Sequence, residues 1–337
     1  MTDPSVVRHV AYEQWDSSSF SAGTFSGTAL TGGALTVATP IDSVPYADPF
    51  GSGSTPVYDL ATWMSPVVTP GFDYTELVAS WNASTPAGTW VQVSVSGVGD
   101  DGVRSKEYIL GRWAAETGAI HRTSVPAQGD DLATVAIDTL VARAGRSLST
   151  WQLKVSLFRE IGSTATPSVR LVGAMTSRLP STTKKEPVSP LGGAEGITLP
   201  VPTYSQEIHV GEYPQYNGGG EAWCSPTSTA MVLAYWQQTN AGYGPSPADY
   251  ADIPYADPWV DYAAANTYDY NYDGTGNWPF NTAYAGRYGL ESFVTRLRSL
   301  TEAEQFIKAG IPLVASLSFK KSELTGAGYD TNGHLMV

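Results

Sequence analysis

The sequence has few cysteines and few basic residues, and both shortages limit its possible functions. It contains one cysteine in 337 residues, which excludes an intrachain disulfide and any zinc cluster built from several cysteines. Lysine and arginine total 19 against 32 acidic residues, for a net charge of −13. Nucleic acids and anionic membranes bind basic patches, so this balance argues against either partner.

Long apolar runs are absent as well. No stretch approaches the roughly 20 residues that a membrane-spanning helix needs, and residues 1–10 lack the apolar core of a signal peptide. Only 15% of residues are charged, and Gly, Ser, Thr, Tyr and Trp are abundant, a composition typical of exported bacterial proteins. We therefore expect a secreted or cell-surface protein whose leader lies outside this sequence, with a cytoplasmic location as the alternative.

The chain is long and apolar enough, at 42% hydrophobic residues, to predict two folded domains. In the first half Val91, Val93 and Val95 alternate with polar residues, and residues 151–157 repeat the pattern, which indicates half-buried strands. Further short strands are predicted at 74–81, 106–113, 132–141 and 168–174. Regularly spaced strands without a helical period predict an all-β sandwich over residues 1–178.

Two features of this sandwich leave alternatives open. The tryptophans could form a platform for cell-wall carbohydrate, or they could belong to the core, where tryptophan in a sandwich is more often found. They are Trp15, Trp63, Trp81 and Trp113. Asp130 and Asp131 could bind calcium at a strand edge, or they could cap backbone N–H groups in a turn.

The pattern dissolves into Pro, Ser, Thr and Gly over residues 179–199, which we interpret as a linker to a second domain at 200–337. There we predict a helix at 281–289, a strand at 290–297 and a strand at 311–319. Thr301 is expected to cap a helix, with Glu304 completing a capping box. Helices that precede and flank strands predict an α+β domain.

The single cysteine, Cys224, lies where a glycine-rich loop turns into a predicted helix. Ser225 suits an N-cap, and Pro226 suits the first helical turn because its missing N–H would have no partner there. The N-terminal end of the helix dipole favours thiolate over thiol. An apolar face is expected to pack this helix into a core, formed by Met231, Val232, Tyr235 and Trp236.

A nucleophilic thiolate needs a proton acceptor, and such partners are usually distant in sequence. His334 is the well-placed histidine downstream of Cys224, whereas His9, His121 and His209 lie in no motif.

Four segments in this order carry a resemblance: Val-Pro-Thr-Tyr-Ser-Gln206, Trp-Cys224-Ser-Pro-Thr-Ser, Ala-Gly-Ile-Pro-Leu-Val and Gly-His334-Leu. Together they resemble cysteine peptidase family 39, the bacteriocin-processing type, and most closely the stand-alone family-39-like domain of bacterial proteins. The resemblance covers residues 200–337 and leaves the sandwich outside. It implies a papain-like fold with Cys224 as nucleophile, His334 as general base and Gln206 as the side-chain donor to the oxyanion.

The chain departs from that family in two places. Ser225 stands where glycine is common, which adds a side chain close to the thiol. Family members also carry an Asp or Asn beyond the histidine to orient its ring, whereas this sequence stops at Val337. We expect a domain truncated at its C-terminus with the orienting residue beyond Val337, and Asp330 or Asn332 as upstream alternatives.

One metal signature is present. Asp269, Asn271 and Asp273, followed by Gly274, match the opening of an EF-hand calcium loop, although Phe280 stands at the twelfth position instead of glutamate. The alternative is an Asx-rich turn that caps its own backbone.

These features predict cysteine-dependent hydrolysis of a peptide or amide bond through a thioacyl intermediate, with a peptide or protein substrate and no required cofactor. Two alternatives stay open. The first is a catalytically inactive, exported binding or adhesion protein whose sandwich engages carbohydrate or protein. The second is a transpeptidase or transamidase that uses the same thiol.

Overall fold

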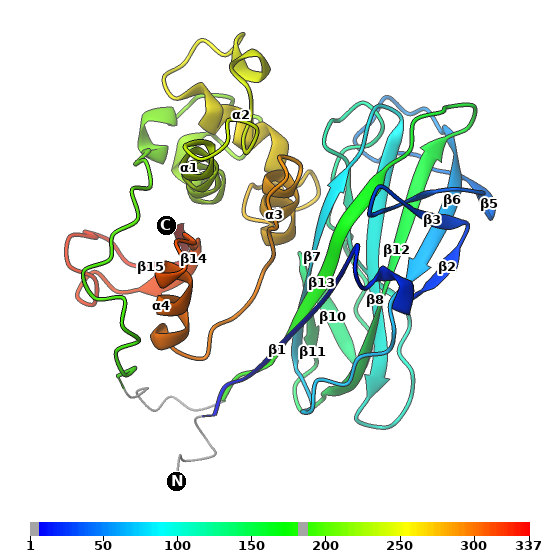
Figure 1. Ribbon diagram of the computed structural model, residues 1–337, viewed down its shortest axis with the longest axis horizontal. Coiled ribbons are helices and arrows are strands. Elements are labelled where there is room, and N and C mark those ends of the chain that lie inside the picture. The colour runs from blue at the N-terminus through cyan, green and yellow to red at the C-terminus, as the bar shows by residue number, and fades with distance from the viewer. Residues whose placement is uncertain (1–6, 181–187) are drawn as a thin grey trace.

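The computed structural model describes residues 7–180 and 188–337, and its N-terminal half is two antiparallel β-sheets packed face to face (Figure 1). The strand order is β10-β11-β7-β13-β4-β3 in the seven-stranded sheet, where β1 also pairs with β13, and β2-β6-β12-β8-β9 in the six-stranded sheet, where β5 pairs with β6. The strands are β1 (His9–Asp16), β2 (Thr24–Ser26), β3 (Thr28–Thr31), β4 (Ala34–Val37), β5 (Asp42–Pro45), β6 (Val57–Met64), β7 (Glu76–Ser84), β8 (Thr89–Gly99), β9 (Tyr108–Trp113), β10 (Ala133–Ala136), β11 (Thr139–Ala142), β12 (Leu148–Glu160) and β13 (Ser168–Arg178). A short 3-10 turn, η2 (Phe20–Ala22), separates β1 from β2.

The all-β prediction for this half is confirmed, and the alternation in the sequence explains it. Val91, Val93 and Val95 on β8 are each at most 1% exposed, and β12 buries the apolar members of its own alternating run. The predicted strands at 74–81, 106–113 and 168–174 correspond to β7, β9 and β13. The predicted strand at 132–141 is instead a hairpin of β10 and β11, because Ile137 takes a positive φ of 61° that turns the chain back.

The tryptophans of the sandwich belong to its core. Trp15, Trp63, Trp81 and Trp113 are all at most 4% exposed, so they cannot form a carbohydrate platform. Asp130 Oδ1 accepts hydrogen bonds from the N–H groups of Leu132 and Ala133, both at 3.0 Å. This is the capping arrangement that the turn alternative predicted.

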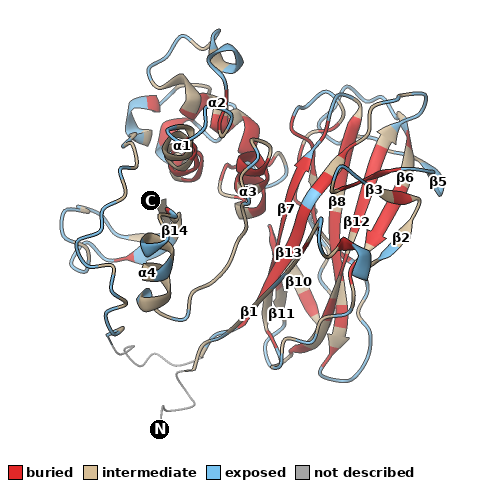
Figure 2. Cartoon of the chain, viewed as in Figure 1, coloured by how far each residue is buried: buried red, intermediate tan, exposed pale blue. Residues whose placement is uncertain are grey.

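The second half combines helices with one small antiparallel sheet, as the α+β prediction required. Burial is concentrated in the first three α-helices, while the two-stranded sheet is mostly half-buried or exposed (Figure 2). The elements are η3 (Gln206–His209), η4 (Gly220–Ala222), α1 (Cys224–Gln237), η5 (Pro247–Tyr250), α2 (Pro258–Thr267), α3 (Trp278–Gly286), α4 (Leu300–Lys308), β14 (Ala315–Phe319) and β15 (Thr331–Met336). The predicted strand at 311–319 therefore begins only at Ala315.

The predicted strand at 290–297 is wrong. This segment forms no strand, because side chains of β7 hydrogen-bond its backbone in place of a neighbouring strand. Asn82 accepts from the N–H of Ser292 at 3.1 Å and donates to its carbonyl at 2.8 Å. The Ser80 hydroxyl accepts from the N–H of Val294 at 2.7 Å.

Two predicted helix starts are also wrong. Helix α3 begins at Trp278, not at 281, because the side chain of Asn277 accepts from the N–H of Phe280 as its N-cap. Helix α4 is capped by Ser299 instead of Thr301, since the Thr301 hydroxyl donates to the Pro190 carbonyl.

The predicted linker at 179–199 includes residues 181–187, which lie outside the described residues. Its later part contains no helix or strand, yet it is bound to α4. Glu304, the predicted capping-box residue, accepts from the N–H groups of Gly192 at 2.8 Å and Ala194 at 2.9 Å. The later part of the predicted linker is therefore held against α4.

The sandwich packs directly against the helices of the second half. Phe280 and Ala283 of α3 belong to the same buried cluster as Trp81 of β7, and α3 lies against this sheet (Figure 1). Arg122, 2% exposed, donates to the Ala265 carbonyl of α2 at 2.8 Å. The fold therefore uses the sandwich as a base for the helical half.

Candidate active site

Cys224 is the first residue of α1, and its side chain is partly exposed. The N-cap is Trp223 instead of the predicted Ser225, because the buried Trp223 indole donates to the Tyr216 carbonyl at 2.7 Å and fixes the chain before the helix. Trp223 provides no side-chain cap. The first N–H groups of α1 therefore lack a side-chain acceptor next to the thiol, which favours negative charge there.

Ser225 lies within the first turn of α1, 1% exposed, and its hydroxyl has no hydrogen-bond partner among the described residues. The buried face of α1 starts here with small polar side chains and continues through Ala230 and Leu233. The predicted apolar face of Met231, Val232, Tyr235 and Trp236 is only half-buried. The small residues of α1 face the core because they allow α2 and α3 to lie close to α1. The hydrogen bond of 3.0 Å between the side chains of Thr229 in α1 and Asn281 in α3 is an example.

The glycine loop before Cys224 packs η3, which begins with Gln206, against η4. Gly219 has a φ of 95°, and a Cβ added to Gly220 would lie 2.1 Å from the Gln206 carbonyl oxygen. Only glycine allows this approach of η4 to η3. The Gln206 side chain then donates from Nε2 to the Glu221 carbonyl at 2.8 Å, three residues before Cys224.

His334 comes from β15, opposite Leu317 of β14. The strand is bound to α1 because the Ser228 hydroxyl donates to the Leu335 carbonyl at 3.1 Å. Partial burial lowers the pKa of His334, opposed by the nearby Glu207 carboxylate of η3. The lowered pKa favours the neutral imidazole, the form that a general base requires.

These contacts place η3 beside η4, which directly precedes α1, and β15 beside α1. Among the described residues, however, no hydrogen bond joins the side chains of Cys224, His334 and Gln206 to one another. No described residue hydrogen-bonds the ring of His334. Asp330 Oδ1 instead accepts from the N–H of Lys321 at 2.7 Å, and Asn332 is exposed. Neither upstream alternative orients the histidine in this structure.

Residues 11–177 match the family described as Peptidase C39 N-terminal domain, and residues 198–337 match the Peptidase_C39 like family. The chain is a C39-like peptidase domain protein. The sandwich, which lies outside the resemblance drawn from the sequence, is thus also part of a C39 peptidase architecture. No curated protein sequence matches the chain.

Solved structures offer only weak likeness. The structure of infectious bursal disease virus Gt strain matches at 13% identity and a TM-score of 0.23, covering 50% of this chain and 33% of that chain. The VP2 subviral particle of infectious bursal disease virus matches at 12% identity and 0.23, covering 52% and 36%. This chain therefore spans about a third of the length of those two chains.

In the C39-like domain the predicted calcium residues form a hydrogen-bonded turn. Asp269 is fully buried, and its Oδ1 accepts from the N–H groups of Asn271 at 3.0 Å and Tyr272 at 3.1 Å. Asp273 accepts from the Tyr268 hydroxyl. These contacts match the Asx-turn alternative, and the calcium hypothesis stays a prediction.

A cavity of about 180 Å³ lies between α1 and α2. Its wall includes Tyr204, Ala230, Leu233 and Trp259, and it touches neither Cys224 nor His334. It is therefore not the place where the thiol would act.

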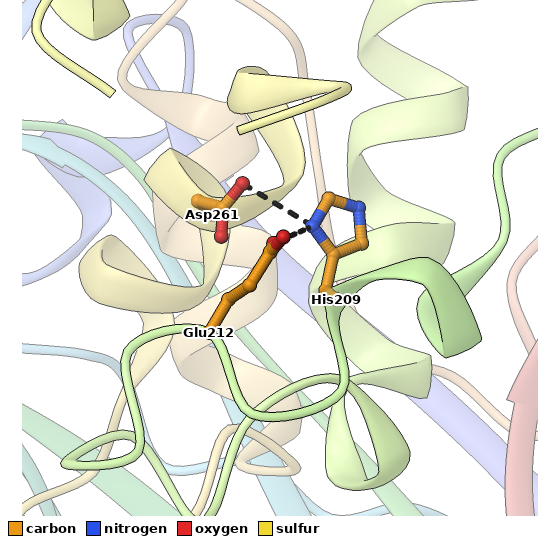
Figure 3. A group of neighbouring side chains, drawn as sticks. All are labelled: His209, Glu212 and Asp261. Carbon is orange, nitrogen blue, oxygen red and sulfur yellow. Dashed lines mark hydrogen bonds and ion pairs between the residues drawn. The ribbon is translucent and has the colours of Figure 1, made fainter. Parts of the chain in front are cut away.

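A second group of polar side chains, which no sequence motif indicated, is formed by His209, Glu212 and Asp261 (Figure 3). His209 and Glu212 are three residues apart, but Asp261 comes from α2. No local pattern could have joined it to the other two, because only packing of α2 against η3 brings it there.

Proposed function

We propose that the C39-like domain cleaves peptide or amide bonds through a thioacyl intermediate on Cys224. The observation that carries the proposal is the position of a partly exposed thiol at an uncapped helix start. Gln206 hydrogen-bonds the Glu221 carbonyl just before α1, and the strand that carries His334 is hydrogen-bonded to α1 through Leu335 and Ser228. A nucleophile on a helix and a base on a strand are the features of a papain-like site.

His334 takes the thiol proton, and the Cys224 sulfur attacks the carbonyl carbon. The oxyanion accepts hydrogen bonds from Gln206 and from the backbone N–H of Cys224. The intermediate collapses as His334 passes the proton to the leaving amine, which leaves an acyl group on sulfur. Water, deprotonated by His334, then releases the acid and restores the thiol.

The same steps with an amine in place of water would give a transpeptidase. We favour hydrolysis, on the C39-like match over residues 198–337. We further propose that the protein is exported and acts on peptides outside the cell, on the basis of its low charge content and acidic balance. No helix among the described residues is long and apolar enough to cross a membrane.

A second candidate function is a binding module without catalysis. It is favoured by one observation, namely that no described residue hydrogen-bonds the ring of His334. An imidazole without an orienting partner can adopt the wrong tautomer, and in the catalytic triad of serine proteases the loss of the orienting carboxylate costs about 10⁴ in turnover. Peptide binding without turnover would then be the outcome.

The experiment is hydrolysis of a diverse peptide library by the full chain, read by mass spectrometry, with Cys224→Ala as the background. We expect cleavage that the variant lacks, and trapping of the thioacyl group by hydroxylamine as a hydroxamate. Gln206→Ala should lower kcat about 10²- to 10³-fold, the loss typical of one oxyanion donor. Equal cleavage by Cys224→Ala would refute the proposal. Peptide binding with no cleavage would favour the second candidate.

A further inference from the structure

The side-chain group that the peptidase proposal does not use is formed by His209, Glu212 and Asp261 (Figure 3). His209 ends η3, Glu212 lies in the following turn, and Asp261 lies in the first turn of α2. His209 Nδ1 is 2.7 Å from Glu212 Oε2 and 3.2 Å from Asp261 Oδ2. One donor atom from each residue lies within 4.8 Å of the others.

This group is buried and incompletely bonded. The side chains of His209 and Asp261 are both 0% exposed, and that of Glu212 is 18% exposed. Neither oxygen of Asp261 accepts a hydrogen bond from any described residue, and His209 Nε2 has no partner either. A buried carboxylate without donors is costly, and native structures satisfy such a group with a donor, a counter-charge or a metal.

The charge of the group is also unbalanced. Two carboxylates beside a neutral imidazole carry −2, and protonation of the imidazole reduces this only to −1. A single proton on Nδ1 can serve one carboxylate fully, so the other stays without a donor. Among the described residues, the ion pairs of Glu212 and Asp261 both run to His209 and not to a lysine or arginine. One divalent cation would bring the group to neutrality.

We propose that His209, Glu212 and Asp261 bind a divalent transition-metal ion of the Zn²⁺ class. One imidazole nitrogen with two carboxylate oxygens is a donor set that Zn²⁺ accepts, whereas Ca²⁺ and Mg²⁺ prefer oxygen alone. Bond lengths near 2.0–2.2 Å place neighbouring ligands of a tetrahedral ion about 3.3 Å apart. The distances of 2.7 Å and 3.2 Å at Nδ1 need only small movements to meet this.

With Nδ1 bound to the ion, the remaining imidazole proton lies on Nε2, on a ring that faces the Trp223 ring at 5.9 Å. The role of the ion is structural. It would bind η3 to α2 at the point where the backbone of Gly220 packs on Gln206 and His209. The site is separate from Cys224 and holds whether or not the thiol is catalytic.

The test starts with the full chain, stripped by a chelator and dialysed, to which Zn²⁺ is added in a calorimetric titration. We expect one equivalent to bind and the Tm to rise. Glu212→Gln and Asp261→Asn should each weaken binding at least about tenfold, because loss of even a hydrogen-bond partner of a metal ligand usually costs about 10- to 100-fold. Asp252→Asn, an exposed carboxylate before α2, is the matched control and should bind as the parent does.

Cysteine and histidine are common zinc ligands, so Cys224 and His334 could also bind the ion. The titration is therefore repeated with Cys224→Ser. Retention of one equivalent supports the proposed site, and its loss places the ion at the thiol and overturns the proposal. Cobalt(II) gives a second readout: visible d–d bands without thiolate charge transfer support nitrogen and oxygen ligands. If Asp261→Asn does not fold, Glu212→Gln decides. No stoichiometric binding by the folded parent refutes the site and leaves a proton-bridged group.

Discussion

Replacing Asp269 with alanine should destabilise the whole protein, because this one carboxylate joins three parts of the fold. Its Oδ1 accepts from the N–H of Ser124 in the sandwich at 3.0 Å, in addition to two N–H groups of its own turn. Its Oδ2 accepts from the side chain of Asn277, the N-cap of α3, at 2.9 Å.

The magnitude follows from these four donors. A buried donor left without an acceptor costs about 1–3 kcal/mol, and relaxation of the turn will allow water to reach some of them. We therefore expect Asp269→Ala to lower the free energy of unfolding by about 4 kcal/mol, the low end of the sum over four donors. Asp269→Asn keeps one acceptor oxygen and should cost about half as much.

The assay is equilibrium unfolding in urea followed by fluorescence of the buried tryptophans. Asp252→Ala, an exposed carboxylate, is the control and should change stability by no more than about 0.5 kcal/mol. A loss below about 1 kcal/mol for Asp269→Ala would refute the reasoning, because it would mean that the four hydrogen bonds contribute little. The loop also holds Ala222, whose carbonyl accepts from Thr275 at 3.2 Å, so alkylation of Cys224 is a useful second readout.

Three other side-chain environments give measurable expectations. Burial raises the pKa of Asp138 from its usual value of 3.8 to about 6, against the opposing hydrogen bond from the N–H of Trp278. The stability that this carboxyl group contributes is therefore complete below about pH 4 and lost as the pH rises through about 6, so Asp138→Asn should gain about 3 kcal/mol relative to the parent between pH 4 and pH 8 in urea unfolding. Parallel pH profiles of the two proteins would contradict this. The calcium hypothesis for Asp269, Asn271 and Asp273 requires calcium to restore the Tm of chelated protein. Because Asp269 already accepts hydrogen bonds from N–H donors, we expect calcium at about 1 mM to leave the Tm unchanged and zinc to raise it. Restoration of the Tm by calcium would instead support a calcium site in this loop. Asp330→Ala and Asn332→Ala should leave peptide cleavage within about twofold, the change expected for surface residues, since neither hydrogen-bonds the ring of His334. Loss of cleavage in one of them would identify it as the orienting residue.

Much of the sandwich was predictable because side-chain direction in a strand has a fixed period of two residues. Alternation at 91–95 and 151–157 therefore indicates which residues of β8 and β12 face the core. The helix at Cys224 was also predictable from local signals, as was the order of the four segments that resemble family 39. Predictions from local sequence were wrong where a distant group bonded the same side-chain atoms. The Thr301 hydroxyl donates to the Pro190 carbonyl, and Glu304 accepts from the N–H groups of Gly192 and Ala194.

Local sequence is enough to set the periods of the strands, the place of the thiol at a helix start and the absence of intrachain disulfides. Which residues meet depends instead on tertiary packing. The segment 290–297 has the composition of a strand, yet its backbone hydrogen-bonds the side chains of Asn82 and Ser80 and not another strand. Asp261 reaches His209 only because α2 packs against η3. The difference arises because periodicity depends on each residue's own geometry, whereas the partner of a buried polar atom depends on the packing of elements far apart in the chain.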